Sequence, residues 1–127
     1  MNVLLMISTA GSEKEARKIA RKLVEDKMAA CVNVIPKIAS FFFWNGKLCE
    51  ENEAMIFIKT GKRRLSELIN KIKAMHSYNV PEIIFLEVDG GEKRYLQWVR
   101  AMSLEKNKTN GKKSAKRIGG KATSLFR

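Results

Sequence analysis

Apolar and polar positions follow two periods along the first hundred residues. The continuous apolar run from Val3 to Ile7 is typical of a strand that is central in its sheet or covered on both faces. Ser12 then stands three residues before Glu15, the spacing of a helix-capping box. Apolar residues recur after it at i, i+3, i+4, i+7 and i+8, which predicts a helix over residues 13–26. The stripe consists of Ala16, Ile19, Ala20, Leu23 and Val24.

The next thirty residues have the character of strands. An apolar segment begins at Cys31 and is interrupted by Pro36, which cannot donate to a strand ladder and therefore predicts a bulge or an edge. Asn45-Gly46 tolerates positive φ at both positions and predicts a type I′ hairpin turn. The return strand is expected over residues 47–60, giving a hairpin with unusually long arms.

The second half of the chain again alternates between helical and strand patterns. A helix is predicted over residues 62–76, a strand over residues 82–89, and a short helix around Tyr95–Met102 after Gly90-Gly91. This order predicts an α+β fold, the ferredoxin-like split βαβ sandwich with a long β-hairpin and a C-terminal helix. Right-handed crossovers are expected to place the first and fourth strands at the centre of the sheet, with helices on one face.

Two features predict self-association. The long hairpin must extend past its own sheet, and four consecutive aromatic residues near its tip, Phe41 to Trp44, would form a costly exposed patch on a monomer. The first strand is also apolar on both sides, although helices are expected on one face. We therefore expect a second subunit to cover these surfaces.

Charge divides the chain into two parts. Of 25 Lys and Arg residues, eight lie in residues 106–127, which hold no acid; residues 1–105 then carry 17 basic and 13 acidic residues, a net charge of +4. We expect one folded domain over residues 1–104 and a basic, disordered tail over residues 105–127. Weak, sequence-independent contact of the tail with RNA or acidic surfaces is one interpretation. A solvated tail without a partner is the simpler one.

Location and redox state follow from what the sequence lacks. No apolar run approaches the roughly 20 residues that span a bilayer, so no membrane partner is expected. The N-terminus lacks the pattern of a secretory signal, which favours a cytoplasmic protein. Two cysteines are too few for a disulfide scaffold, and Cys31 and Cys49 are expected to be free thiols.

The candidate metal ligands are Cys31, His76 and Glu82. His76 is the single histidine, and it precedes Tyr78 and Glu82 at the join between a helix and a strand. Its imidazole would suit copper or zinc, and the Cys31 thiolate would suit soft ions. A helix-dipole role for His76 and an inert core thiol for Cys31 are the structural alternatives. One histidine and no Cys-x-x-Cys argue against a closed zinc site of four N or S ligands within one chain and favour a loose site or one shared between subunits.

Aromatic residues suggest a second kind of site. Trp44, Tyr78 and Trp98 would wall a pocket at a subunit interface, together with Phe42, and Lys59 would supply a cation for a small anion. The alternative is plain packing, because aromatic residues are enriched at interfaces for their buried area alone. No glycine-rich phosphate loop supports nucleotide binding.

Five segments in this order resemble those of the CutA family, the divalent-cation-tolerance proteins. They are Ala30-Cys31-Val32-Asn33, the aromatic hairpin tip of residues 40–47, the acidic patch and Lys-Thr strand end of residues 50–60, His76-Ser77-Tyr78-Asn79-Val80-Pro81-Glu82-Ile83-Ile84, and Tyr95-Leu96-Gln97-Trp98-Val99. The resemblance covers about Val3 to Met102. It implies a tight homotrimer with hairpins pairing between neighbours, and a link to copper and other divalent metals. The tail has no counterpart in this pattern.

Four functions are compatible with these residues. The first is a non-enzymatic homotrimer that binds copper or a similar divalent ion through Cys31, His76 and Glu82, without an obligatory cofactor. The second is a signalling-type trimer that holds a small anion between subunits, against which the missing glycine-rich loop counts. The third is an enzyme with His76 as general base, for which no substrate is suggested. The fourth is an RNA-associated protein acting through its tail.

Overall fold

The computed structural model describes residues 2–103, so the predicted tail of residues 105–127 lies outside the described residues. The elements follow the predicted order. They are β1 (Val3–Ala10), α1 (Glu13–Glu25), β2 (Cys31–Trp44), β3 (Lys47–Gly61), the short 3-10 helix η1 (Lys62–Arg64), α2 (Leu65–Met75), β4 (Ile83–Glu87) and α3 (Lys93–Met102). The predicted second helix is thus split into η1 and α2, and β4 is shorter than expected.

The four strands form one antiparallel-paired sheet in the order β2-β3-β1-β4. The predicted α+β fold and the central position of the first strand are confirmed, but the prediction that the fourth strand is central is wrong. β1 pairs with β3 on one side and β4 on the other, which leaves β4 at an edge. The two strands that each crossover helix connects are not neighbours in the sheet. β3 lies between β1 and β2, and β1 lies between β3 and β4.

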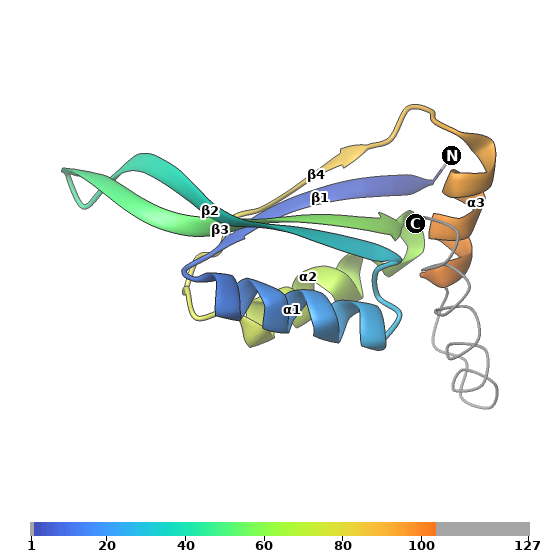
Figure 1. Ribbon diagram of the computed structural model, residues 1–127, viewed down its shortest axis with the longest axis horizontal. Helices are drawn as coiled ribbons and strands as arrows, with labels where there is room; N and C mark the ends of the chain where they lie inside the picture. Colours follow the sequence, from blue (N-terminus) through green and yellow to red (C-terminus); the bar gives the residue numbers. More distant parts are fainter. Residues whose placement is uncertain (1, 104–127) are drawn as a thin grey trace.

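The main core lies between the sheet and two helices on one of its faces, as Figure 1 shows. In α1 the apolar stripe contributes Ala16, Ile19 and Leu23, all fully or almost fully buried. Strand residues that alternate along β1 and β3 face them. The cluster comprises Met6, Ala10, Ala16, Ile19, Leu23, Ala29, Ala54, Ile56, Ile58, Leu68 and Ile72. This pattern is what a period of two on strands and 3.6 on helices produces.

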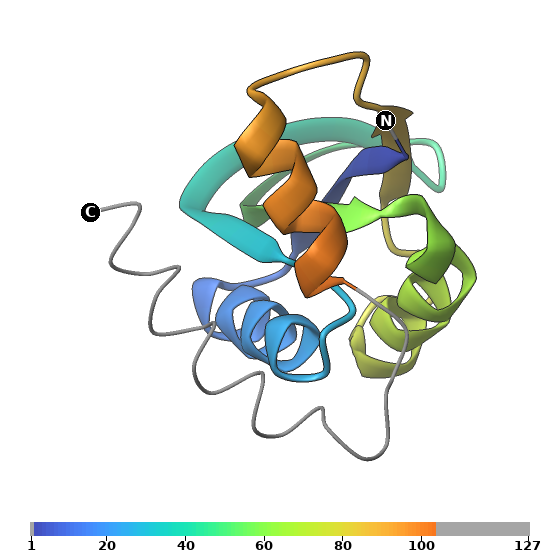
Figure 2. The same cartoon turned by 90° about the vertical axis from the view of Figure 1, so that its right-hand side faces the viewer.

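The third helix has a different position, because α3 crosses the end of the sheet rather than lying on its face (Figure 2). Its residues Leu96 and Val99 pack against Val3 of β1 and Ala30, which precedes β2, to form a second, smaller cluster. Glu92 caps its N-terminus by accepting a hydrogen bond from the Tyr95 N–H at 2.9 Å. This end of the molecule is therefore built from the start of β1, the end of β3 and α3.

The hairpin of β2 and β3 extends well beyond the other strands (Figure 1). The register shifts between Ile35 and Ile38, which is the irregularity predicted around Pro36. The turn has φ of 52° at Asn45 and 75° at Gly46, as a type I′ turn requires. All four tip aromatics are exposed, including Phe43 at 73% and Trp44 at 58%. The expected aromatic patch is thus present on the single chain.

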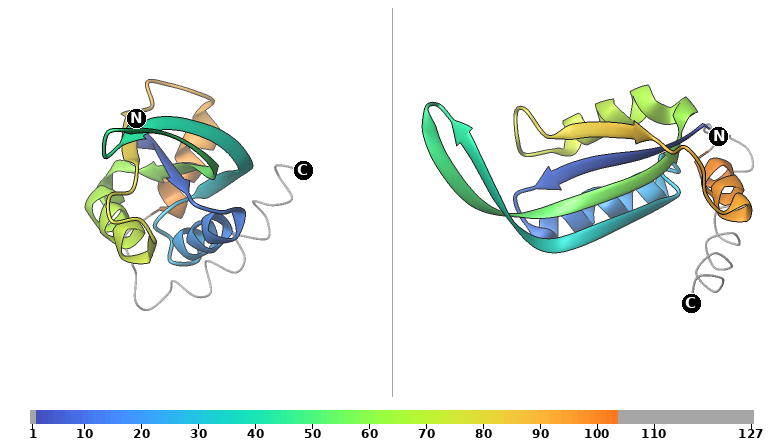
Figure 3. Two further views of the ribbon diagram at one scale, coloured as in Figure 1. Left: turned by 90° about the vertical axis from the view of Figure 1, so that its left-hand side faces the viewer. Right: turned by 90° about the horizontal axis from the view of Figure 1, so that it is seen from above.

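The second face of the sheet has no helix over it within residues 2–103, as the view from above in Figure 3 shows. Side chains that alternate with the core residues point to this open face. Leu5 and Ile7 of β1 are half-buried there. Their cross-strand partners on β4, Leu86 and Ile84, are 56% and 53% exposed. A hydrophobic open face and a projecting hairpin are thus combined in one subunit. No helix among the described residues is long and apolar enough to cross a membrane.

Two neighbouring residues of α1 provide a test of the layer arrangement. Leu23 is fully buried against the sheet, whereas Val24 is 42% exposed. We expect Leu23→Ala to lower the free energy of unfolding by about 2–5 kcal/mol, because it leaves a cavity in the core. Val24→Ala should change it by about 0.5 kcal/mol. Urea unfolding followed by circular dichroism measures both, and equal losses would contradict the packing of α1.

Candidate functional site

The corner after α2 is organised around the single histidine. His76 ends α2 as its C-cap, and its backbone N–H donates to the Ile72 carbonyl at 2.9 Å. Its side chain is buried, with Nε2 2.6 Å from the Thr9 carbonyl oxygen and Nδ1 accepting from the Tyr78 N–H at 3.0 Å. A carbonyl oxygen only accepts, so Nε2 carries the proton and the imidazole is the neutral Nε2–H tautomer. Both ring nitrogens are therefore occupied.

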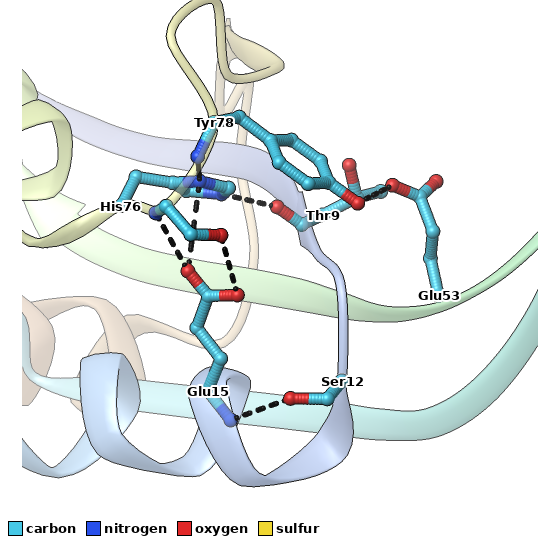
Figure 4. Close-up of polar contacts among 7 residues, drawn as sticks. Thr9, Ser12, Glu15, Glu53, His76 and Tyr78 are labelled. Carbon is cyan, nitrogen blue, oxygen red and sulfur yellow. Dashed lines mark hydrogen bonds and ion pairs between the residues drawn. The ribbon is translucent and has the colours of Figure 1, made fainter.

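A glutamate from α1 completes this corner (Figure 4). The Ser12 hydroxyl caps α1 by accepting from the Glu15 N–H at 3.1 Å, as the capping-box spacing predicts. The Glu15 carboxylate accepts from the Ser77 N–H at 2.8 Å and from the Ser77 hydroxyl at 3.0 Å. Burial raises the pKa of Glu15, but these hydrogen bonds outweigh it, and the net pKa is lowered. The carboxylate thus ties the start of α1 to the loop between α2 and β4.

A second acid approaches the corner from the hairpin. The Tyr78 hydroxyl donates to Oε2 of Glu53 at 2.8 Å, and the Tyr78 ring lies 4.8 Å from the His76 ring, centre to centre. Burial, together with the adjacent Glu53 carboxylate, raises the pKa of Tyr78 to about 12. Tyr78 therefore stays protonated and continues to donate across the neutral pH range. It joins the α2–β4 loop to β3 at the point where the hairpin leaves the sheet.

A cavity of about 720 Å³ lies beside this link, along the projecting hairpin, and its lining extends from Glu53 to the tip aromatics. Its lining combines aromatic rings with three carboxylates and several neutral polar groups. The residues are Thr9, Ser40, Phe41, Phe42, Trp44, Glu51, Glu53, Tyr78, Asn79, Val80 and Glu82. With carboxylates and no basic residue in its lining, this cavity favours cations over anions.

The structure does not bring the three predicted metal ligands together. Glu82 lines the cavity, His76 lies behind Tyr78 with both nitrogens bonded, and Cys31 begins β2 opposite Lys59. Cys31 is half-buried, with Sγ 3.8 Å from Oδ1 of Asn33. Within residues 2–103 no group of three or more His, Cys, Asp or Glu side chains is placed to hold a metal ion. The predicted set therefore does not fit a metal within one subunit.

The predicted aromatic pocket is divided in the same way. Trp44 and Tyr78 line the hairpin cavity. Lys59 and Trp98 lie beside Tyr95, with the Lys59 Nζ 5.9 Å from the centre of the Tyr95 ring and the Trp98 ring 5.7 Å from it. Lys59 is six residues from Glu53 along β3, about 20 Å at the rise of an extended strand. Within one chain these four residues therefore form two separate clusters, Trp44 with Tyr78 and Lys59 with Trp98.

Sequence reasoning missed three residues of the corner. Thr9 contributes a backbone carbonyl, which no side-chain pattern reveals. Glu15 was recognised as part of a helix cap, but its partner Ser77 is 62 positions away. Glu53 belongs to the acidic patch within residues 50–60. Its position on the hairpin arm, near the predicted aromatic pocket, is the sequence signal that could have identified it as a site residue. Its pairing with Tyr78 depends on the crossover of α2.

The lowered pKa of Glu15 predicts a pH dependence of stability. A carboxyl group whose pKa is lower in the folded state stabilises the fold above its unfolded pKa, near 4.5, and this contribution is lost as pH falls through the folded value. We expect Glu15→Gln to flatten the dependence of the free energy of unfolding on pH below about 5. Urea midpoints across a pH series measure it. Glu25→Gln, at an exposed position at the end of α1, is the control, and parallel curves for Glu15→Gln and wild type would contradict the assignment.

Comparison with known proteins agrees with this architecture. The family model described as CutA1 divalent ion tolerance protein matches residues 4–102. The divalent-cation tolerance protein CutA of Thermus thermophilus is 40% identical over 96 residues, which are 76% of this chain and 93% of that protein. The human protein CutA is 43% identical over 95 residues, 75% of this chain and 53% of the human protein. The chain thus spans about half the length of the human relative.

Solved structures give the same result. The Cut A1 structure from Thermus thermophilus superposes with a TM-score of 0.78 at 37% identity, covering 80% of this chain and 99% of that chain. CutA from Xylella fastidiosa gives a TM-score of 0.80 at 33% identity, covering 82% of this chain and all of that one. The sequence resemblance, the family model and the fold therefore agree, and the chain belongs to the CutA1 divalent ion tolerance protein family.

Proposed function

We propose that the chain acts as a non-enzymatic homotrimer in divalent-cation tolerance, and that it binds copper or another divalent ion with ligands from more than one subunit. The observation that carries this proposal is the incompleteness of the single subunit. Its hairpin projects from the sheet, its tip aromatics are exposed, and its second sheet face is apolar and bare within residues 2–103.

Association would remove these surfaces from water. Burying apolar area contributes about 25 cal/mol for each Å². The open face supplies Leu5, Ile7, Leu86 and Ile84, and the hairpin supplies its aromatic tip. β4 is also an edge strand with unpaired backbone groups, and an extended hairpin from a neighbour is the kind of element that pairs with such an edge. Three copies related by a threefold axis would bury these apolar surfaces and would also pair the edge strand β4.

The donor groups of the hairpin cavity support the proposal of ion binding across the interface. The cavity holds Glu51, Glu53 and Glu82, whose oxygens suit divalent cations. One subunit does not complete a ligand set among its described residues. Since the hairpin is the element that would reach a neighbour, this cavity is where a second chain would add ligands. Of the three predicted ligands, Glu82 is the one that lines it.

The bonding of His76 supports a non-enzymatic role. A general base needs a free lone pair, and the His76 Nδ1 pair accepts from the Tyr78 N–H while Nε2–H is held by Thr9. The carboxylates of the cavity count against a small anionic ligand there. Both cysteines are free, which fits the reducing cytoplasm that we propose as the compartment.

Native mass spectrometry tests the assembly. We expect the wild type at three times the 14.5-kDa chain mass. Trp44→Asp should dissociate or unfold it, because a charge would be buried in the hairpin contact. Val24→Asp, on the exposed side of α1, is the matched control and should leave the trimer intact. A folded wild-type monomer would overturn the proposal.

Calorimetry with Cu(II) tests the ion site. We expect Glu82→Gln to weaken binding on the order of tenfold or more, because it replaces a charged ligand with a neutral amide. Glu25→Gln, which removes the same charge from the end of α1, should not change the affinity. His76→Gln, which retains a donor and an acceptor, should also bind normally. A wild type that binds no ion after chelator treatment and Cu(II) addition would refute the metal role, and a loss confined to His76→Gln would move the site to the imidazole.

A further inference from the structure

The three carboxylates of the hairpin cavity are spread over two segments of the chain. Glu51 and Glu53 are two positions apart on β3, so they lie on the same face of the strand, about 7 Å apart along it. Glu82 comes from the loop between α2 and β4. Although all three line one cavity, no three such groups within residues 2–103 are placed to hold one metal ion. Their arrangement suits several separated positive charges better than a single one.

Glu53 is the most deeply placed of the three carboxylates. It is 9% exposed, whereas Glu51 and Glu82 are exposed. Its Oε2 accepts the hydrogen bond from the neutral Tyr78 hydroxyl at 2.8 Å (Figure 4). Within the described part of the chain, no basic side chain forms an ion pair with any of the three carboxylates. Since a buried charge without an opposite charge is costly, a cation that enters the cavity would supply the missing partner.

Aromatic rings are the second feature of this lining, and they point to an organic cation. Phe42 and Trp44 alternate along β2 on one face, and the Tyr78 ring belongs to the loop that also carries Glu82. Ammonium groups are attracted to the faces of aromatic rings, and the methylene chains that carry them pack on apolar surface. A hydrated inorganic ion gains less from such walls. The combination of rings and carboxylates therefore matches ammonium groups joined by methylene chains.

The size of the cavity and the charge of the chain narrow the ligand further. The volume of about 720 Å³ lies within the range of small-molecule sites, about 300–1,000 Å³. The chain as a whole has a net charge of +12 and therefore repels cations. A multiply charged cation that binds must then be held by groups at one place, and the hairpin cavity has three carboxylates and no basic residue in its lining.

We propose that the hairpin cavity binds a linear aliphatic polyamine. Its ammonium groups pair with Glu51, Glu53 and Glu82, and its methylene chain lies against the aromatic rings. The separation of about 7 Å between the first two glutamates along β3 is one that a butylene spacer between two ammonium groups bridges. This site shares the cavity of the proposed ion site but requires no metal, so copper and polyamine exclude each other there.

Calorimetry of the chelator-treated, full-length protein with spermidine tests this site. We expect the wild type to bind, and Glu51→Gln to weaken binding on the order of tenfold, because it removes a charge-assisted hydrogen bond. The matched control is Glu50→Gln, which removes the same charge from the adjacent position on the other face of β3, outside the lining. Equal losses in the two variants would show that net charge alone is measured, and would overturn the site. A wild type that takes up no spermidine would also overturn it.

Two further titrations identify the ligand class and separate this proposal from the proposed function. Hexaamminecobalt(III) has the same charge as spermidine but is compact and has no methylene chain. We expect it to bind more weakly than spermidine, and equal or tighter binding would overturn the polyamine assignment. The Cu(II) titration is the second. Uptake of Cu(II) without uptake of spermidine would overturn the polyamine site and leave the proposed function standing, whereas uptake of spermidine without Cu(II) would support the site and refute the metal role.

Discussion

The pairing of β1 with two neighbours is the constraint on which the rest of this structure depends. Because β1 lies between β3 and β4, both crossover helices are placed on the same face of the sheet, and the opposite face is left bare within the described residues. The same arrangement leaves β2 and β4 at the edges, and β2 with β3 free to extend as a hairpin. An apolar open face and a projecting arm are therefore consequences of one topology.

The two ends of the sheet have opposite chemistry. Along the hairpin at one end, Glu51, Glu53 and Glu82 give an acidic cavity with aromatic walls, suited to cations. At the other end, Lys62, Arg63 and Arg100 line a cavity that has no acidic side chain in its lining. Charges of one sign gathered in a recess act together on a ligand more strongly than the same charges dispersed. The net charge of the whole chain, +12, conceals this separation.

The corner around His76 shows how a chemically versatile residue can be wholly used by the fold. Its imidazole joins α2 to β1 through Thr9, and the adjacent Ser77 and Tyr78 join the same loop to α1 through Glu15 and to β3 through Glu53. Three elements thus converge on three consecutive residues. Buried polar groups are costly unless they are bonded, and here each bond also positions the loop that carries Glu82 to the cavity.

The sequence by itself determined the elements and their order, the Asn45-Gly46 turn, the irregularity near Pro36 and the family, because periodicity and turn chemistry are local properties. It also predicted that the tip aromatics form an exposed patch on a single chain, which the structure confirms. The order of strands in the sheet was decided by long-range pairing, which local pattern does not encode, and the expected central place of the fourth strand was wrong. Only the tertiary structure separated Cys31 from His76, and brought Glu15 to Ser77 and Arg63 to Arg100, because crossovers set distances that spacing along the chain does not.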